Sequence, residues 1–223
     1  MEGTIRHIQE FQPDSKDFST LTKYEIKRSV WLLTLIGSPV GIMLGQFFEK
    51  FRFFLRFYLI RKFIESTIFK QFCGGTSLDD SIGTINKLSR RGISTVLDYA
   101  GEGFKTDSDF DQSVIKLIES IRFASDHSDV STISMKITSI GDSEVLENYK
   151  KGSNFLDQNL VIHKIFRRLR SICAQADECG VAIFIDAEES WLQDAIDDLT
   201  IQMMALFNQS KIVVYNTYQM YLK

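Results

Sequence analysis

Proline, cysteine and histidine are all scarce in this chain of 223 residues, and each shortage narrows the choice of protein class. The two prolines, Pro13 and Pro39, leave no proline-rich linker that would divide the chain. The cysteines are odd in number and lack the paired spacing of a zinc site, which indicates a reducing compartment. The three histidines stand far apart and form no metal-ligand motif, so we expect no metal site.

An excess of positive charge is also missing. The formal net charge is −3 and the isoelectric point is about 5.7, so the composition lacks the excess of basic residues that is typical of a nucleic-acid-binding protein. A hydrophobic share of 44% beside 25% charged residues is typical of a protein with a packed core. Residues 1–18 contain neither the apolar region of a signal peptide nor the arginine-rich, acid-poor pattern of a transit peptide, so we expect an irregular arm.

The segment from residue 21 to about residue 71 has a helical and strongly aromatic pattern. Residues 30–48 contain no charged side chain and are long enough to cross a bilayer, but Gly37 and Pro39 interrupt them. Residues 48–63 then place cations among aromatic side chains every few positions. We therefore expect helices that pack on a barrel or touch a membrane surface, in preference to a membrane-spanning helix.

Apolar runs alternate with amphipathic segments after Gly92. The stretch between each predicted strand and the next is long enough for a helical crossover, which favours a parallel sheet. The run at 181–185 has no charge and is rich in β-branched residues, as a buried parallel strand requires. The predicted strands are 95–97, 131–138, 181–185 and 211–217, and the predicted helices lie at 110–121, within 142–179 with a break near Gly152, and at 191–199.

Polar residues gather where these strands end, the edge at which α/β folds place their chemistry. Asp186, Glu188 and Glu189 follow the run 181–185 directly. For Glu189 we favour capping of the next helix, and for Asp186 a functional role. Lys136 lies within a predicted apolar strand, where an ammonium group needs either an ion pair with an acid such as Asp186 or an anionic substrate.

Several long stretches resemble the proline dehydrogenase family. They are STIFKQFCGG (66–75), TVLDYAGEG (95–103), MKITSIG (135–141), IDAEESWLQDAIDDL (185–199) and YNTYQMYLK (215–223), and they occur in the family's order. The resemblance implies an α/β fold, namely a partial (βα)8 TIM barrel of about four βα units preceded by an N-terminal helical arm. The implied domains are a helical arm at 1–92 and the first half of the barrel at 93–223.

The resemblance also implies a function, the oxidation of L-proline to Δ1-pyrroline-5-carboxylate with hydride transfer to FAD. Lys136 matches the lysine that binds the substrate carboxylate, and Asp186 matches the catalytic aspartate. Ala187 and Gln219 match positions that contact the flavin. A membrane quinone would accept the electrons, with peripheral membrane contact. The compartment would be the mitochondrial inner membrane or matrix in a eukaryote, and the cytoplasm or membrane surface in a bacterium.

The sequence departs from the family after the fourth strand. The family's fifth-strand arginine and its late pair of arginines have no counterpart before Lys223, so we expect a truncated family member that is inactive alone. One alternative is a non-catalytic barrel fragment that binds partners through its open strand edges. Another is a hydrolase or lyase barrel that uses the carboxylates, although the intact stretch 185–199 argues against it.

Overall fold

The computed structural model describes residues 22–39, 41–43, 46, 62, 64–99, 101, 103–149 and 160–221. The chain divides into two compact units, 1–74 and 75–223, and each is described by itself. Helix α5 (Leu78–Ser89) precedes the expected domain boundary at 92/93, yet it belongs to the second unit and buries Ile85 in the core there. Ser77 caps this helix by accepting a hydrogen bond from the Asp80 N–H, as its sequence indicates.

The first unit is helical where it is described. Helix α1 (Lys23–Ile36) begins with a capping box, in which Thr22 and Glu25 each bond the other's backbone N–H. A π-helical turn, η2 (Glu65–Phe69), leads into the short helix α4 (Lys70–Phe72). No helix formed by the described residues is long and apolar enough to cross a membrane. Residues 47–61, most of the predicted aromatic and cationic segment, lie outside the described residues.

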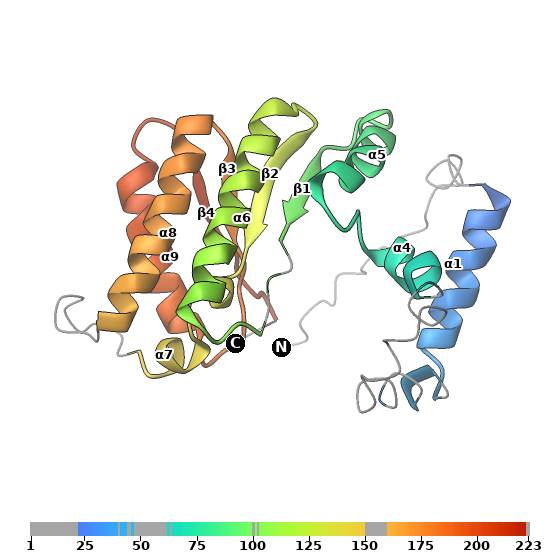
Figure 1. Ribbon diagram of the computed structural model, residues 1–223, viewed down its shortest axis with the longest axis horizontal. Coiled ribbons are helices and arrows are strands. Elements are labelled where there is room, and N and C mark those ends of the chain that lie inside the picture. The colour runs from blue at the N-terminus through green and yellow to red at the C-terminus, as the bar shows by residue number, and fades with distance from the viewer. Residues whose placement is uncertain are drawn as a thin grey trace, which may run out of the picture. The chain divides into compact units, whose positions relative to one another are not determined.

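The second unit is built on a four-stranded parallel sheet with the strand order β1-β2-β3-β4 (Figure 1). Each strand is joined to the next through helices, which confirms the expected βα repeat. The strands are β1 (Thr95–Asp98), β2 (Val130–Met135), β3 (Ala182–Ile185) and β4 (Val214–Asn216), and the long helices between them are α6 (Asp107–Asp126), α8 (Leu160–Cys179) and α9 (Gln193–Phe207).

Two sequence-based predictions differ from the structure in detail, and a third is not tested. Strand β2 ends at Met135, so Lys136 precedes the turn η3 (Ile137–Ser139) and does not lie within a strand. Helix α9 begins only at Gln193, and Trp191, predicted to lie on its apolar face, is in the preceding turn and 62% exposed. Helix α7 (Ser143–Glu147) follows η3, and the predicted break near Gly152 lies outside the described residues.

The core lies between the sheet and helices α6, α8 and α9, which run along one face of it (Figure 1). Strand β3 alternates accordingly, with Ile183 and Ile185 fully buried and Phe184 half-buried on the other face. In a closed barrel this other face of the sheet would line the interior. Within the part of the chain that the structure describes it remains partly open, since Val96 is 45% exposed and Tyr215 is 38% exposed.

Replacing Ile183 by alanine tests this core. The side chain is fully buried at the centre of β3, and a cavity there should cost about 2–5 kcal/mol of unfolding free energy. The matched control is Ile201→Ala on α9, where the side chain is 54% exposed and the change should stay within about 0.5 kcal/mol. Urea denaturation measures both values, and equal effects would contradict the assigned core.

Candidate functional site

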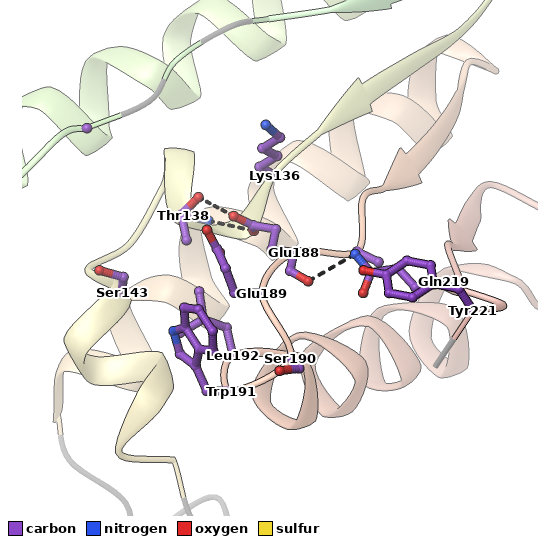
Figure 2. Close-up of a pocket in the computed structure, with 12 residues that line it drawn as sticks. Lys136, Thr138, Ser143, Glu188, Glu189, Ser190, Trp191, Leu192, Gln219 and Tyr221 are labelled. Carbon is purple, nitrogen blue, oxygen red and sulfur yellow. Dashed lines mark hydrogen bonds between the residues drawn. The ribbon is translucent and has the colours of Figure 1, made fainter. Parts of the chain in front are cut away.

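A cavity of about 850 Å³ opens where strands β2, β3 and β4 end (Figure 2). Parallel strands all finish at one edge of the sheet, so the segments that follow them meet there. The lining residues come from the turn after β2, the loop after β3 and the segment after β4, together with Gly103 from the loop after β1 and Ser143 from the start of α7. The other lining residues are Lys136, Thr138, Ala187, Glu188, Glu189, Ser190, Trp191, Leu192, Gln219 and Tyr221.

The turn after β2 holds Lys136 and Thr138 in place at the cavity. The carbonyl of Lys136 accepts hydrogen bonds from the Ser139 N–H at 3.1 Å and from the Ser139 hydroxyl at 2.6 Å. The Ile140 N–H closes the turn on the Ile137 carbonyl at 3.0 Å. Lys136 itself is half-buried. A cation at the end of a strand, beside solvent, is less costly than one inside the strand.

Glu188 joins the loop after β3 to this turn. Its carboxylate accepts a hydrogen bond from the Thr138 N–H at 3.1 Å and a second one from the Thr138 hydroxyl (Figure 2). Burial raises the pKa of the Glu188 carboxyl above its ordinary value, although the Thr138 hydrogen bonds act in the opposite direction. The protonation of Glu188 therefore depends on its hydrogen bonds to Thr138 in the turn.

Further polar contacts extend from Glu188 to β4. The Glu188 carbonyl accepts a hydrogen bond from the Gln219 amide at 3.2 Å, and its N–H donates to the Gln193 side chain at 3.0 Å. Gln193 donates to Asp197 at 2.8 Å, one turn along α9. The same Asp197 oxygen accepts from Asn216, the last residue of β4, at 2.9 Å. These contacts fix the loop after β3 against both α9 and β4.

The backbone of Asp186 extends the β2–β3 ladder by one step, because its N–H donates to the Met135 carbonyl at 2.9 Å. Its side chain is half-buried. Glu189 is exposed and lines the cavity, whereas the N-cap position of α9 is Leu192, and no side chain there accepts a capping hydrogen bond. Capping by Glu189, the interpretation favoured from the sequence, is therefore wrong.

A comparison with models of known protein families shows to which family this chain belongs. The family model described as proline dehydrogenase matches residues 81–223. The chain belongs to the proline dehydrogenase family. The matched region includes all four strands and every residue that lines the cavity.

Two relatives show how far the likeness extends. Proline dehydrogenase 1, mitochondrial, of Dictyostelium discoideum is 31% identical over 198 residues, which cover 72% of this chain and 35% of the relative. A probable proline dehydrogenase, mitochondrial, of Schizosaccharomyces pombe is 26% identical over 248 residues, which cover 90% of this chain and 49% of the relative. The chain spans less than half the length of either relative.

A solved structure confirms the fold. Proline utilization A (PutA) from Bdellovibrio bacteriovorus superposes with a TM-score of 0.62 at 16% sequence identity, over 93% of this chain and 22% of that one. The expected α/β architecture, a partial TIM-type barrel, is thereby confirmed.

Three of the four site residues that were expected from the sequence line the cavity, namely Lys136, Ala187 and Gln219. The fourth, Asp186, directly precedes the lining residue Ala187, and the roles of all four stay predictions. Sequence reasoning missed the chain of polar contacts behind the cavity, formed by Gln193, Asp197 and Asn216. A glutamine and an aspartate four residues apart on a helix were the available signal.

Glu188→Gln tests the electrostatics of the site. The pKa of Glu188 is raised in the folded state, so its contribution to stability is present at low pH and is lost as pH rises from about 4.5 through the folded-state value. Wild-type unfolding free energy should therefore fall over this window, and the glutamine variant should lose that part of the slope. Urea titrations at several pH values measure both, with the exposed Glu147→Gln as the control. Identical pH profiles for all three proteins would contradict the assignment.

Proposed function

We propose that this protein acts in the oxidation of L-proline to Δ1-pyrroline-5-carboxylate with FAD as cofactor, the first step of proline catabolism. In this reaction a ring C–H bond breaks with loss of hydride, the ring nitrogen loses a proton, and a C=N bond forms. The observation that carries the proposal is the family match over residues 81–223, which contains the whole cavity at the strand ends.

The residues at the cavity suit a flavin. A volume of about 850 Å³ falls within the usual range for cofactor pockets, and the lining offers amide groups beside aromatic rings. Ala187 would contact the flavin through its backbone, and Gln219 would do so through its side-chain amide. Gln219 is already oriented by its bond to the Glu188 carbonyl. When bound, FAD supplies the acceptor for the hydride, a capacity that no protein side chain has.

Lys136 would bind the carboxylate of proline. Among the residues that line the cavity, Lys136 has the cationic side chain. The turn that carries Lys136 is fixed by hydrogen bonds that involve Ser139 and Glu188. A charge-assisted hydrogen bond from a preorganised cation would orient the ring and lower the cost of binding an anion. Asp186, at the end of β3, would hold the charged groups of the site in register.

The electron acceptor and the location follow as further parts of the proposal. A membrane quinone would take the electrons, with contact at the membrane surface. The relatives from Dictyostelium and Schizosaccharomyces are both named mitochondrial, which supports the mitochondrial inner membrane or matrix for a eukaryotic source. The cytoplasm or the membrane surface is the corresponding proposal for a bacterial source.

A binding role without catalysis is the second candidate. It is favoured by the partly open face of the sheet, where Val96 and Tyr215 are exposed although a closed barrel buries this face. On this interpretation residues 1–223 fold but do not oxidise proline alone.

Flavin binding and proline-dependent reduction separate the two candidates. Purified protein is mixed with FAD, gel-filtered, and examined for visible flavin absorption, after which L-proline is added without oxygen. Retained flavin that bleaches on addition of proline supports the proline dehydrogenase function. A cooperatively folded protein that retains no flavin supports the binding role, and retained flavin that proline leaves unbleached contradicts the proposed substrate.

Replacing Lys136 by methionine tests the proposed carboxylate contact. A charge-assisted hydrogen bond is worth about 1.5–3 kcal/mol, so kcat/KM for proline should fall about ten- to a hundredfold while flavin content stays close to that of the wild type. Steady-state reduction of a dye measures this. The control is Lys116→Met on α6, an exposed lysine outside the cavity. A separate variant, Asp186→Asn, should lower turnover more than it lowers thermal stability. Unchanged kcat/KM in Lys136→Met would remove Lys136 from the substrate site.

A further inference from the structure

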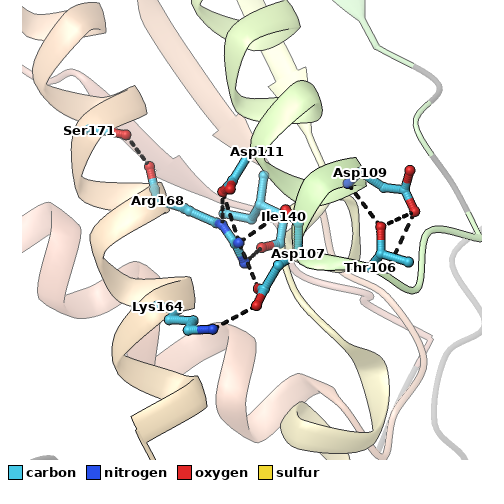
Figure 3. Close-up of polar contacts among 8 residues, drawn as sticks. All are labelled: Thr106, Asp107, Asp109, Asp111, Ile140, Lys164, Arg168 and Ser171. Atoms are coloured by element: carbon cyan, nitrogen blue, oxygen red, sulfur yellow. Dashed lines mark hydrogen bonds and ion pairs between the residues drawn. The ribbon is translucent and has the colours of Figure 1, made fainter.

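Arg168, on α8, makes several polar contacts outside the cavity (Figure 3). Its side chain is only 11% exposed, and all three guanidinium nitrogens donate hydrogen bonds. Nε donates to Asp111 at 2.8 Å, Nη2 donates to the Asp107 carboxylate at 2.8 Å, and Nη1 donates to the Ile140 carbonyl at 3.2 Å. The guanidinium carbon also lies 5.4 Å from the centre of the Phe110 ring.

These partners belong to different strand-end segments. Asp107 and Asp111 stand in the first turns of α6, which follows β1, whereas Ile140 follows the turn after β2. Lys164, one turn before Arg168 on α8, also pairs with Asp107 at 2.6 Å. The hydrogen bonds from Lys164 and then from Arg168 lower the pKa of the Asp107 carboxyl, which favours its charged form. The contact to Ile140 is the one that reaches the turn beside the cavity.

The turn after β2 is thereby held from two sides. On the cavity side Glu188 accepts hydrogen bonds from Thr138, and on the helix side Arg168 donates to the carbonyl of Ile140, two residues later. Ile137 and Ile140 are both fully buried, so the turn is packed as well as hydrogen-bonded. Gly141 lies so close to α8 that an added Cβ would stand 2.4 Å from Cδ1 of Ile165.

We propose that Arg168 is a positioning residue for the cavity: its bond to the Ile140 carbonyl fixes the turn that carries Lys136 and Thr138. This inference rests on the proposed function only where proline binding is concerned. Arginine suits the role because its planar fork can bond two carboxylates and a carbonyl at once. Lysine would keep the positive charge between Asp107 and Asp111, but its single ammonium group could not donate hydrogen bonds to both carboxylates and to the Ile140 carbonyl at once.

Arg168→Lys is therefore the decisive variant, because it keeps a cation between α6 and α8 and removes the fork. The matched control is Arg167→Met, an exposed arginine at the adjacent position of the same helix. The first measurement is amide hydrogen exchange, resolved by NMR, for Thr138, Ser139 and Ile140 in the turn. We expect their exchange to rise about tenfold in Arg168→Lys, as loss of one charge-assisted hydrogen bond would allow. Exchange of the buried Ile183 and Ile185 amides in β3 should not change.

The second measurement is the kinetics with proline. A displaced Lys136 should raise KM about tenfold with little change in kcat, whereas a merely structural role would lower the active fraction and leave KM unchanged. Unchanged exchange in the turn would overturn the proposal, and so would faster exchange in β3 to the same degree. If neither the wild type nor any variant oxidises proline, the proposed function has failed, and the exchange measurement still decides the role of Arg168.

Discussion

The parallel pairing of β2 with β3 is the constraint on which the rest of this structure depends. Ile133 pairs with Ile183 and Met135 pairs with Ile185, and all four side chains are buried against the helices. Since the two strands run in the same direction, they end together, and the Asp186 N–H still bonds the carbonyl of Met135. The turn and the loop that follow therefore begin side by side. The cavity exists because these two segments cannot separate without breaking the ladder.

A second layer of contacts gives the cavity its polar character. Thr138 donates to Glu188, and the contacts through Gln193 and Asp197 extend to Asn216, so each partly buried group in this series has a hydrogen-bond partner. Partly buried polar groups are costly unless they are paired, and a paired network resists displacement of any one member. This property keeps the turn after β2 and the loop after β3 in place at the cavity.

Helix α8 connects the outer layer of the unit to that site. Its inner face contributes several fully buried side chains, including Ile165 and Leu169, which pack on the sheet. Its edge carries Arg168, which contacts the start of α6 and the segment after β2. A helix that supports the core and also holds a strand-end turn couples the stability of the unit to the geometry of its cavity.

Local sequence patterns by themselves determined the order and type of the elements in the second unit. Apolar runs such as 181–185 require burial on both sides, so the strands and the parallel sheet could be predicted. The family resemblance likewise led to Lys136, Ala187 and Gln219, which line one cavity. Only the tertiary structure decided where β2 ends, because the last residue of β2 that pairs with β3, Met135 opposite Ile185, is defined only by the pairing itself. The partners of Glu188 and Arg168 were also beyond the sequence, since these contacts join segments that only folding brings together.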